Sequence, residues 1–79
     1  MIKAWTDYPI VELGDAPNTN APIRECEVIA FDGDKYADVI VGGVKTSFKA
    51  GYLYKERGRS GEVPRISFKE LIKLPSVEL

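Results

Sequence analysis

Alternating hydrophobic and polar positions dominate residues 25–49 and predict three successive β-strands joined by short turns. The alternation has a period of two, which places one face of each strand toward a core and the other toward solvent. It is clearest in the third strand, where Val44, Thr46 and Phe48 alternate with Lys45, Ser47 and Lys49. We therefore expect an antiparallel meander around which the rest of the chain packs.

The two turns within this stretch have recognisable chemistry. Asp32-Gly33-Asp34-Lys35 supplies the Gly and Asp residues that tolerate the left-handed backbone of a tight turn. Gly42-Gly43 lies between Val41 and Val44 with the two-residue spacing of a type I′ or II′ hairpin. The meander is thus predicted by turn chemistry as well as by periodicity.

Residues 2–13 carry enough apolar bulk to cover one end of the meander, and we expect them to be extended. Pro9 disfavours helical geometry at Tyr8 and cannot donate to a central ladder, so a strand here is split at Tyr8-Pro9 or lies at a sheet edge. Trp5 is either a core side chain or an exposed binding aromatic. Residues 14–22 are rich in turn formers, which predicts a surface loop that is either a plain connection or a binding loop.

The alternation ends at Ala50-Gly51, where the glycine indicates a bulge or a bend. Residues 52–54 form a short apolar and aromatic group. Residues 55–62 contain no apolar side chain and two glycines, which predicts a flexible basic loop. Another ordered run begins at Val63, and Arg65 would face solvent if this run is a strand.

The C-terminal segment, residues 67–74, has two interpretations. Phe68, Leu71 and Ile72 have helical spacing, and Ser67 with Glu70 has the form of a capping box. This pattern predicts one or two helical turns over residues 68–74, docked on an open end of the sheet. The alternative is that the last strand continues through this segment. Beyond Pro75, residues 76–79 are expected to form a frayed tail.

Together these elements predict a mainly β fold of four or five short strands with a short C-terminal helical turn. The architecture is expected to be a small SH3-like barrel or a strongly bent antiparallel sheet. All 79 residues are assigned to one small domain, 1–79. The likeness to an SH3-like barrel concerns architecture only, because fold does not determine function.

Composition places the chain among ordinary globular proteins, since 44% of its residues are hydrophobic. The single cysteine, Cys26, has no partner for an intramolecular disulfide and is expected to be a buried core residue. Residues 1–7 lack the apolar run of a signal peptide, and no stretch approaches the roughly 20 residues that cross a bilayer. We therefore expect a cytoplasmic protein that does not associate with membranes.

The net charge is −1, but the charges are unevenly distributed along the chain. Residues 1–44 contain three basic and eight acidic groups, whereas residues 45–73 contain eight basic and three acidic groups. The two segments therefore carry −5 and +5. A basic face follows only if the fold keeps the two segments apart.

Several kinds of catalytic and metal chemistry have no support in the sequence. The chain contains no histidine, which is the commonest general base, so serine and cysteine nucleophiles lack their usual activator. Asp32, Asp34 and Asp38 resemble part of a calcium loop, but Ala37 and Gly43 stand where that pattern requires glycine and glutamate. We expect neither an enzyme nor a metal or cofactor site.

One set of residues combines basic and aromatic side chains in the manner of a binding surface. Basic groups suit phosphate or acidic side chains, while tyrosines supply stacking and hot-spot contacts. The alternative is structural, with the tyrosines capping the core, the lysines protecting a strand edge and the arginines keeping a loop soluble. The candidate binding residues are Lys45, Lys49, Tyr52, Tyr54, Arg57 and Arg59.

The function expected from this set is a non-enzymatic binding module whose partner is another protein. Near-neutral net charge argues against a dedicated nucleic-acid binder, so single-stranded nucleic acid is the alternative ligand of the same surface. A second alternative is a homo-oligomer joined through an uncovered strand edge, or an accessory or inhibitor protein of a mobile element.

Overall fold

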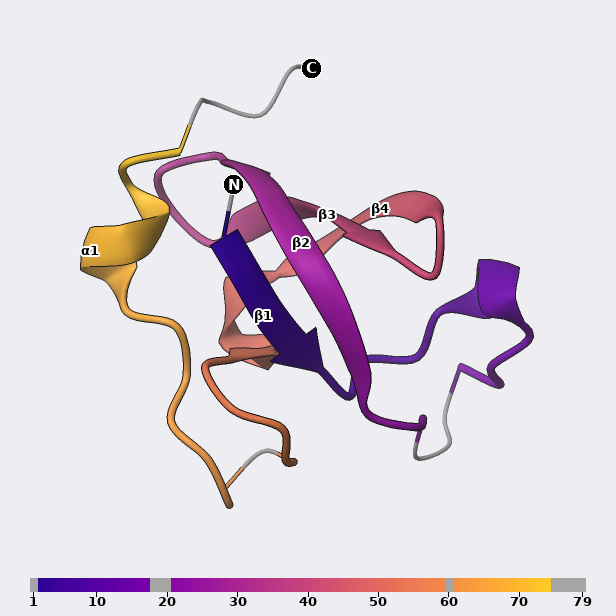
Figure 1. Cartoon of the computed structure of the whole chain (residues 1–79). Helices are drawn as coiled ribbons and strands as arrows, with labels where there is room; N and C mark the ends of the chain where they lie inside the picture. Colours follow the sequence, from indigo (N-terminus) through magenta and orange to yellow (C-terminus); the bar gives the residue numbers. More distant parts are fainter. Residues whose placement is uncertain (1, 18–20, 60, 75–79) are drawn as a thin grey trace.

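The computed structural model describes residues 2–17, 21–59 and 61–74, and it confirms a mainly β fold. Five strands form one antiparallel sheet in the order β4-β3-β2-β1-β5 (Figure 1). The elements, in chain order, are β1 (Ile2–Thr6), the 3₁₀ turn η1 (Val11–Leu13), β2 (Arg24–Phe31), β3 (Tyr36–Val41), β4 (Val44–Lys49), the 3₁₀ turn η2 (Ala50–Tyr52), β5 (Leu53–Tyr54) and α1 (Phe68–Leu71).

The predicted meander is confirmed as β2, β3 and β4. Strand β3 pairs with β4 in an unbroken register from Tyr36 opposite Lys49 to Val41 opposite Val44. Strand β2 pairs with β3 through a register shift between Val28 and Ala30, the kind of irregularity that bends a strand and increases its twist. The alternation read from the sequence therefore gives the correct inside and outside faces in β3 and β4. At the end of β2 it is wrong, because the register shift leaves both Ala30 and Phe31 buried.

Both turns adopt the geometry that their residues favour. One carboxylate oxygen of Asp32 accepts hydrogen bonds from the backbone N–H groups of Asp34, Lys35 and Tyr36 at 2.7, 2.9 and 3.1 Å. Gly42 and Gly43 have φ values of 57° and 81°, which identifies the tighter turn as type I′.

Strand β1 lies inside the sheet, between β2 and β5, rather than at its edge. It ends at Thr6, before the Tyr8-Pro9 pair, so Pro9 lies outside the hydrogen-bond ladder of the sheet. The prediction that this strand lies at a sheet edge is therefore wrong. Trp5 is half-buried on the outer face, opposite Glu25 of β2 and Tyr54 of β5, so it is neither a buried core residue nor a fully exposed one.

The core lies on the opposite face of the sheet. Its fully buried side chains come from every strand, and η1, η2 and α1 contribute the residues around its margin. Cys26 is buried among them, as expected from its position on β2. Members of this core that are less than 2% exposed include Ala4, Val28, Ala37, Val39, Val41 and Leu53.

The sheet is open within the described residues, because β4 and β5 form its two edges and do not pair with each other. Of the two predicted forms, the open antiparallel sheet is therefore the one observed, and the closed barrel is not. The physical reason is the shortness of β5, whose two residues pair with Trp5 and Thr6 of β1.

The C-terminal segment forms a helical turn, so the alternative of a continued strand is wrong. Helix α1 is shorter than predicted, and the Ser67 hydroxyl caps it by accepting a hydrogen bond from the backbone N–H of Glu70 at 3.4 Å. Upstream of it, Arg65 makes only an isolated bridge with Tyr54. The predicted tail, residues 76–79, lies outside the described part of the chain.

Candidate binding site

The six residues predicted to bind do not gather on one surface. Lys49 and Tyr52, at the end of β4 and in η2, are exposed and line the same groove. Lys45 is exposed near the other end of β4, opposite Ile40 of β3, and does not line that groove. The remaining three residues lie elsewhere.

Tyr54 is fully buried, which removes it from any exposed surface. Its hydroxyl donates a hydrogen bond to Oδ1 of Asp7 at 3.2 Å, and its backbone is flanked by β1 on one side and by Arg65 on the other. Tyr54 therefore has a structural role in the fold. The sequence allowed this role as the alternative to binding.

Arg57 and Arg59 follow β5 and contribute nothing to the groove. The guanidinium carbon of Arg57 lies 5.9 Å from the centre of the Trp5 ring, a cation–π arrangement on the outer face. The backbone N–H of Arg59 donates to the Glu62 side chain at 3.0 Å within a tight turn. Both residues thus have contacts inside the protein that the sequence pattern did not reveal.

A groove of about 610 Å³ is lined by residues of α1 and of the turn between β2 and β3. Figure 1 shows α1 beside this turn. We call this groove the basic groove. Segments distant in sequence build it: the end of β2, the turn after it, the end of β4, η2, residues 65–66 and α1. Its lining residues are Phe31, Asp34, Lys35, Lys49, Ala50, Gly51, Tyr52, Arg65, Ile66, Phe68 and Leu71.

The deep side of the basic groove is apolar. Phe31, Ile66 and Leu71 belong to the core and are at most 8% exposed. The ring of Phe68 meets that of Phe31 edge-on, with centroids 5.6 Å apart, and leaves half of its own side chain exposed. Phe68 and Tyr52 are two of the large hydrophobic side chains exposed on the described part of the molecule, and both face this groove.

The exposed side of the groove carries three cations, Lys35, Lys49 and Arg65, against one carboxylate, Asp34. Among the described residues no ion pair involves any of the three cations. A backbone hydrogen bond of 2.7 Å from Ala50 N–H to the Lys35 carbonyl holds Lys35 and Lys49 at neighbouring positions. The groove therefore combines an apolar interior with a formal charge of +2.

A stack of aromatic rings supports one wall of the groove. Tyr8 stacks on Phe48 with ring centroids 4.8 Å apart, and the same distance separates Tyr8 from Tyr52. The backbone N–H of Tyr8 donates to the Thr6 hydroxyl at 3.1 Å, which fixes the chain as it leaves β1. Tyr8 thereby holds Tyr52 at the groove.

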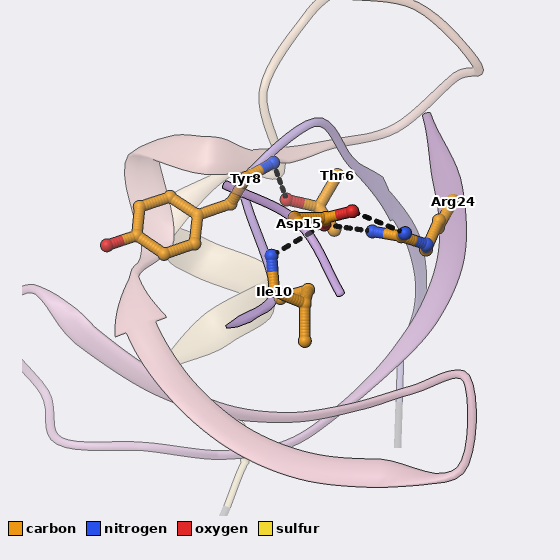
Figure 2. A network of polar contacts seen from close by, with 5 residues as sticks. All are labelled: Thr6, Tyr8, Ile10, Asp15 and Arg24. Atoms are coloured by element: carbon orange, nitrogen blue, oxygen red, sulfur yellow. Dashed lines mark hydrogen bonds and ion pairs between the residues drawn. The ribbon is translucent and has the colours of Figure 1, made fainter. Parts of the chain in front are cut away.

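The segment that carries Tyr8 is locked by a carboxylate in the loop after η1 (Figure 2). Asp15 accepts two hydrogen bonds from the Arg24 guanidinium, at 2.6 and 2.9 Å, and one from the backbone N–H of Ile10 at 2.7 Å. These donors stabilise the ionised carboxylate, and the Arg24 bonds contribute most to lowering the pKa of Asp15 from 3.8 to about 2.

The described residues show little that could act as reactive chemistry. Burial raises the pKa of the Cys26 thiol to about 12, so it stays protonated and unreactive at neutral pH. Within residues 2–17, 21–59 and 61–74, no cluster of three or more His, Cys, Asp or Glu side chains could hold a metal ion.

No protein-family model, curated protein or solved structure matches this chain. Among the described residues, no helix is long and apolar enough to cross a membrane.

Of the residues that line the basic groove, the sequence predicts Lys49 and Tyr52 as binding residues, but not Lys35, Arg65, Phe31 or Phe68. The predicted turn at Lys35 and the predicted helix at Phe68 are both confirmed, but the proximity of these two residues depends on how α1 docks. The only available signal was the amphipathic spacing around Phe68, which predicted docking without indicating where.

Proposed function

We propose that this protein is a non-enzymatic module that binds another protein, and that the basic groove captures an acidic segment of that partner. The observation that carries the proposal is the groove itself, whose apolar interior is bordered by Lys35, Lys49 and Arg65. Lys49 and Tyr52 are the two predicted binding residues that belong to it.

The interior of the groove suits one large apolar side chain of the partner. Its volume of about 610 Å³ accommodates an aromatic or aliphatic side chain together with flanking backbone. Burial of such a side chain contributes roughly 1.5–3 kcal/mol. Tyr52 and Phe68 are already exposed there, and tyrosine is enriched among the residues that dominate binding energy.

The cations around the groove select the charge of the partner. Three positive groups without internal ion pairs attract carboxylates and accelerate association at low salt. Because these groups are exposed, the attraction weakens as salt increases.

A peptide titration tests the proposal. The probe is a short fluorescein-labelled peptide of Asp and Glu with one Phe, and its control carries Ala in place of Phe. We expect the Phe peptide to bind about tenfold more tightly than the Ala peptide, and both to weaken as salt rises. The double variant K49E/R65E should weaken binding by at least about tenfold, because two attractive charges become repulsive.

A matched control distinguishes the groove from overall charge. Lys73 is exposed and lies outside the groove, so Lys73→Glu should leave the affinity nearly unchanged. Unfolding midpoints of all variants show whether the fold survives. Equal binding by K49E/R65E and the unmodified protein would count against the groove.

The alternatives are measured in the same experiment. Tight binding of a labelled single-stranded oligonucleotide, with a steep loss of affinity as salt rises, would favour a nucleic-acid ligand. Two observations argue against such a ligand. The cations Lys45, Arg57 and Arg59 lie apart from the groove. The outer face also carries the carboxylates of Glu25 and Glu27 beside Lys3. Sedimentation would reveal a homo-oligomer.

The finer architectural class and the location form part of the same proposal. A long first connection, a three-stranded meander, a 3₁₀ turn and a short last strand that returns to β1 support an SH3-like arrangement. A reduced, buried Cys26 suits the cytoplasm.

A further inference from the structure

Strand β4 is an edge of the sheet that pairs with no second strand in the described structure. Tyr8 stacks on Phe48 of this strand, and residues 8–17 border Thr46, so its core face is partly covered while its outer backbone groups have no bonded neighbour. The other edge, β5, is flanked by residues 64–66, which bond to it through Lys55 N–H to the Pro64 carbonyl and Ile66 N–H to the Leu53 carbonyl, each at 3.0 Å. Strand β4 pairs with β3 on one side, and among the described residues no backbone group bonds to its other side. One row of β4 backbone groups is thus open.

The hairpin register determines which backbone groups are open. In a two-residue type I′ hairpin the residues that flank the turn, Val41 and Val44, exchange hydrogen bonds, and such pairs then alternate along the ladder. The bond from Ala50 N–H to the Lys35 carbonyl continues the same alternation beyond the strand. The N–H and C=O groups of Lys45, Ser47 and Lys49 therefore point away from β3.

Charge indicates what can occupy this edge. Lys45 and Lys49 are exposed on the same face of β4, two residues on either side of Ser47. A second copy that paired antiparallel about Ser47 would place Lys45 opposite Lys49 of the other copy, and like charges directly opposite are destabilising. A strand with acidic side chains would place carboxylates there instead.

The edge and the basic groove are continuous, because Lys49 belongs to both. We infer that the acidic partner segment binds in extended conformation as a sixth strand along β4 and inserts its large apolar side chain into the groove. This inference rests on the proposed function and adds the mode of recognition, in which main-chain bonds supply affinity and side chains supply specificity.

Backbone-methylated peptides test the inference without altering the protein. Two versions of the acidic Phe peptide are N-methylated at every second residue, one in each phase, so that their side chains are the same. In an added strand only one phase directs its N–H groups toward β4, so one version should lose about tenfold or more in affinity while the other retains it. Equal affinities for the two versions would overturn strand addition.

Amide exchange and one substitution give independent readouts. Saturation with the unmethylated peptide should slow exchange at Lys45, Ser47 and Lys49 selectively, since the N–H groups of Thr46 and Phe48 already face β3. Ser47→Pro removes one outward donor at an edge position that tolerates proline, and it should weaken binding severalfold with the fold intact. Unchanged exchange at all three residues would contradict the inference.

The outcomes separate this inference from the proposed function. If K49E/R65E weakens binding but the two methylated peptides bind equally well, the proposed role of the groove stands and strand addition is rejected. Failure of every acidic peptide to bind rejects both. A dimer that forms through β4 and that no peptide dissociates would show that a second copy of the chain occupies this edge. That result would also reject the inference.

Discussion

Asp15 shows how a single side chain can organise a connection that has little secondary structure. It joins Arg24, at the start of β2, to the backbone of Ile10, just before η1. These contacts bracket the long link between β1 and β2 and keep Tyr8 in place beside Tyr52. The arrangement of residues 8–15 therefore depends on one ionised group.

Stability should depend on the ionisation of Asp15 between about pH 4 and pH 2. The native pKa, about 2, lies below the ordinary value of 3.8, so the contribution is fully present above pH 4 and is lost as the pH falls toward 2. We expect Asp15→Asn to lower the unfolding midpoint at neutral pH and to flatten its decrease in this acidic range.

Urea unfolding at a series of pH values checks this expectation. Asp34→Asn is a suitable control, because the Asp34 carboxylate accepts no hydrogen bond among the described contacts. An acid dependence that is as steep in Asp15→Asn as in the unmodified protein would contradict it. The lowered pKa of Asp32, caused mainly by its hydrogen bond with the Asp34 backbone, leaves some acid sensitivity in both variants.

At the scale of elements, the sequence correctly predicts the turns, strands and caps that depend on interactions between residues close together in the chain. The turns at Asp32 and Gly42-Gly43, the alternation of β4 and the Ser67 cap all act within a few residues, and each is confirmed. The docking of α1 and the pairing of β5 with β1 depend on residues far apart in sequence. The basic groove is built from such long-range contacts, and for that reason the sequence predicts only two of its lining residues, Lys49 and Tyr52, as binding residues.

Gly43 provides a test of the β3–β4 turn as an element. Its φ is 81° and an added Cβ would meet no atom within 4 Å, so only backbone strain opposes a substitution. Gly43→Ala should cost about 1–2 kcal/mol of unfolding free energy. Gly51→Ala is the matched control, because Gly51 has equal space and no positive φ, and its stability should be unchanged or slightly raised.

Denaturant unfolding of the two variants measures the difference directly. If both glycines tolerate alanine equally, the left-handed turn does not determine the hairpin register. That register also decides which β4 groups face outward, so a destabilised turn should weaken any strand that adds to this edge.

At the scale of the whole molecule, stability depends on bringing β5 back to β1. Leu53 is fully buried, pairs with Thr6 and lies in the main core. A domain of this size has a total stability of only about 4–12 kcal/mol. A single cavity at Leu53 should therefore remove a large share of it.

We expect Leu53→Ala to cost about 2–5 kcal/mol, and Val11→Ala, at a side chain that is 61% exposed, to have a small effect. Chemical denaturation monitored by Trp5 fluorescence measures both, because Trp5 lies opposite Tyr54 in the same pair of strands. A loss below about 1 kcal/mol for Leu53→Ala would show that β5 is not essential to the core.

The position of β1 between β2 and β5 has a consequence for synthesis on the ribosome. Ile2–Thr6 is translated before both of its neighbours in the sheet, and the second of them, Leu53–Tyr54, follows almost fifty residues later. Until then the nascent polypeptide exposes the unpaired side of β1 and an incomplete core, a state that attracts chaperones and proteases. Any premature stop before Leu53 should therefore yield a product that the cell degrades.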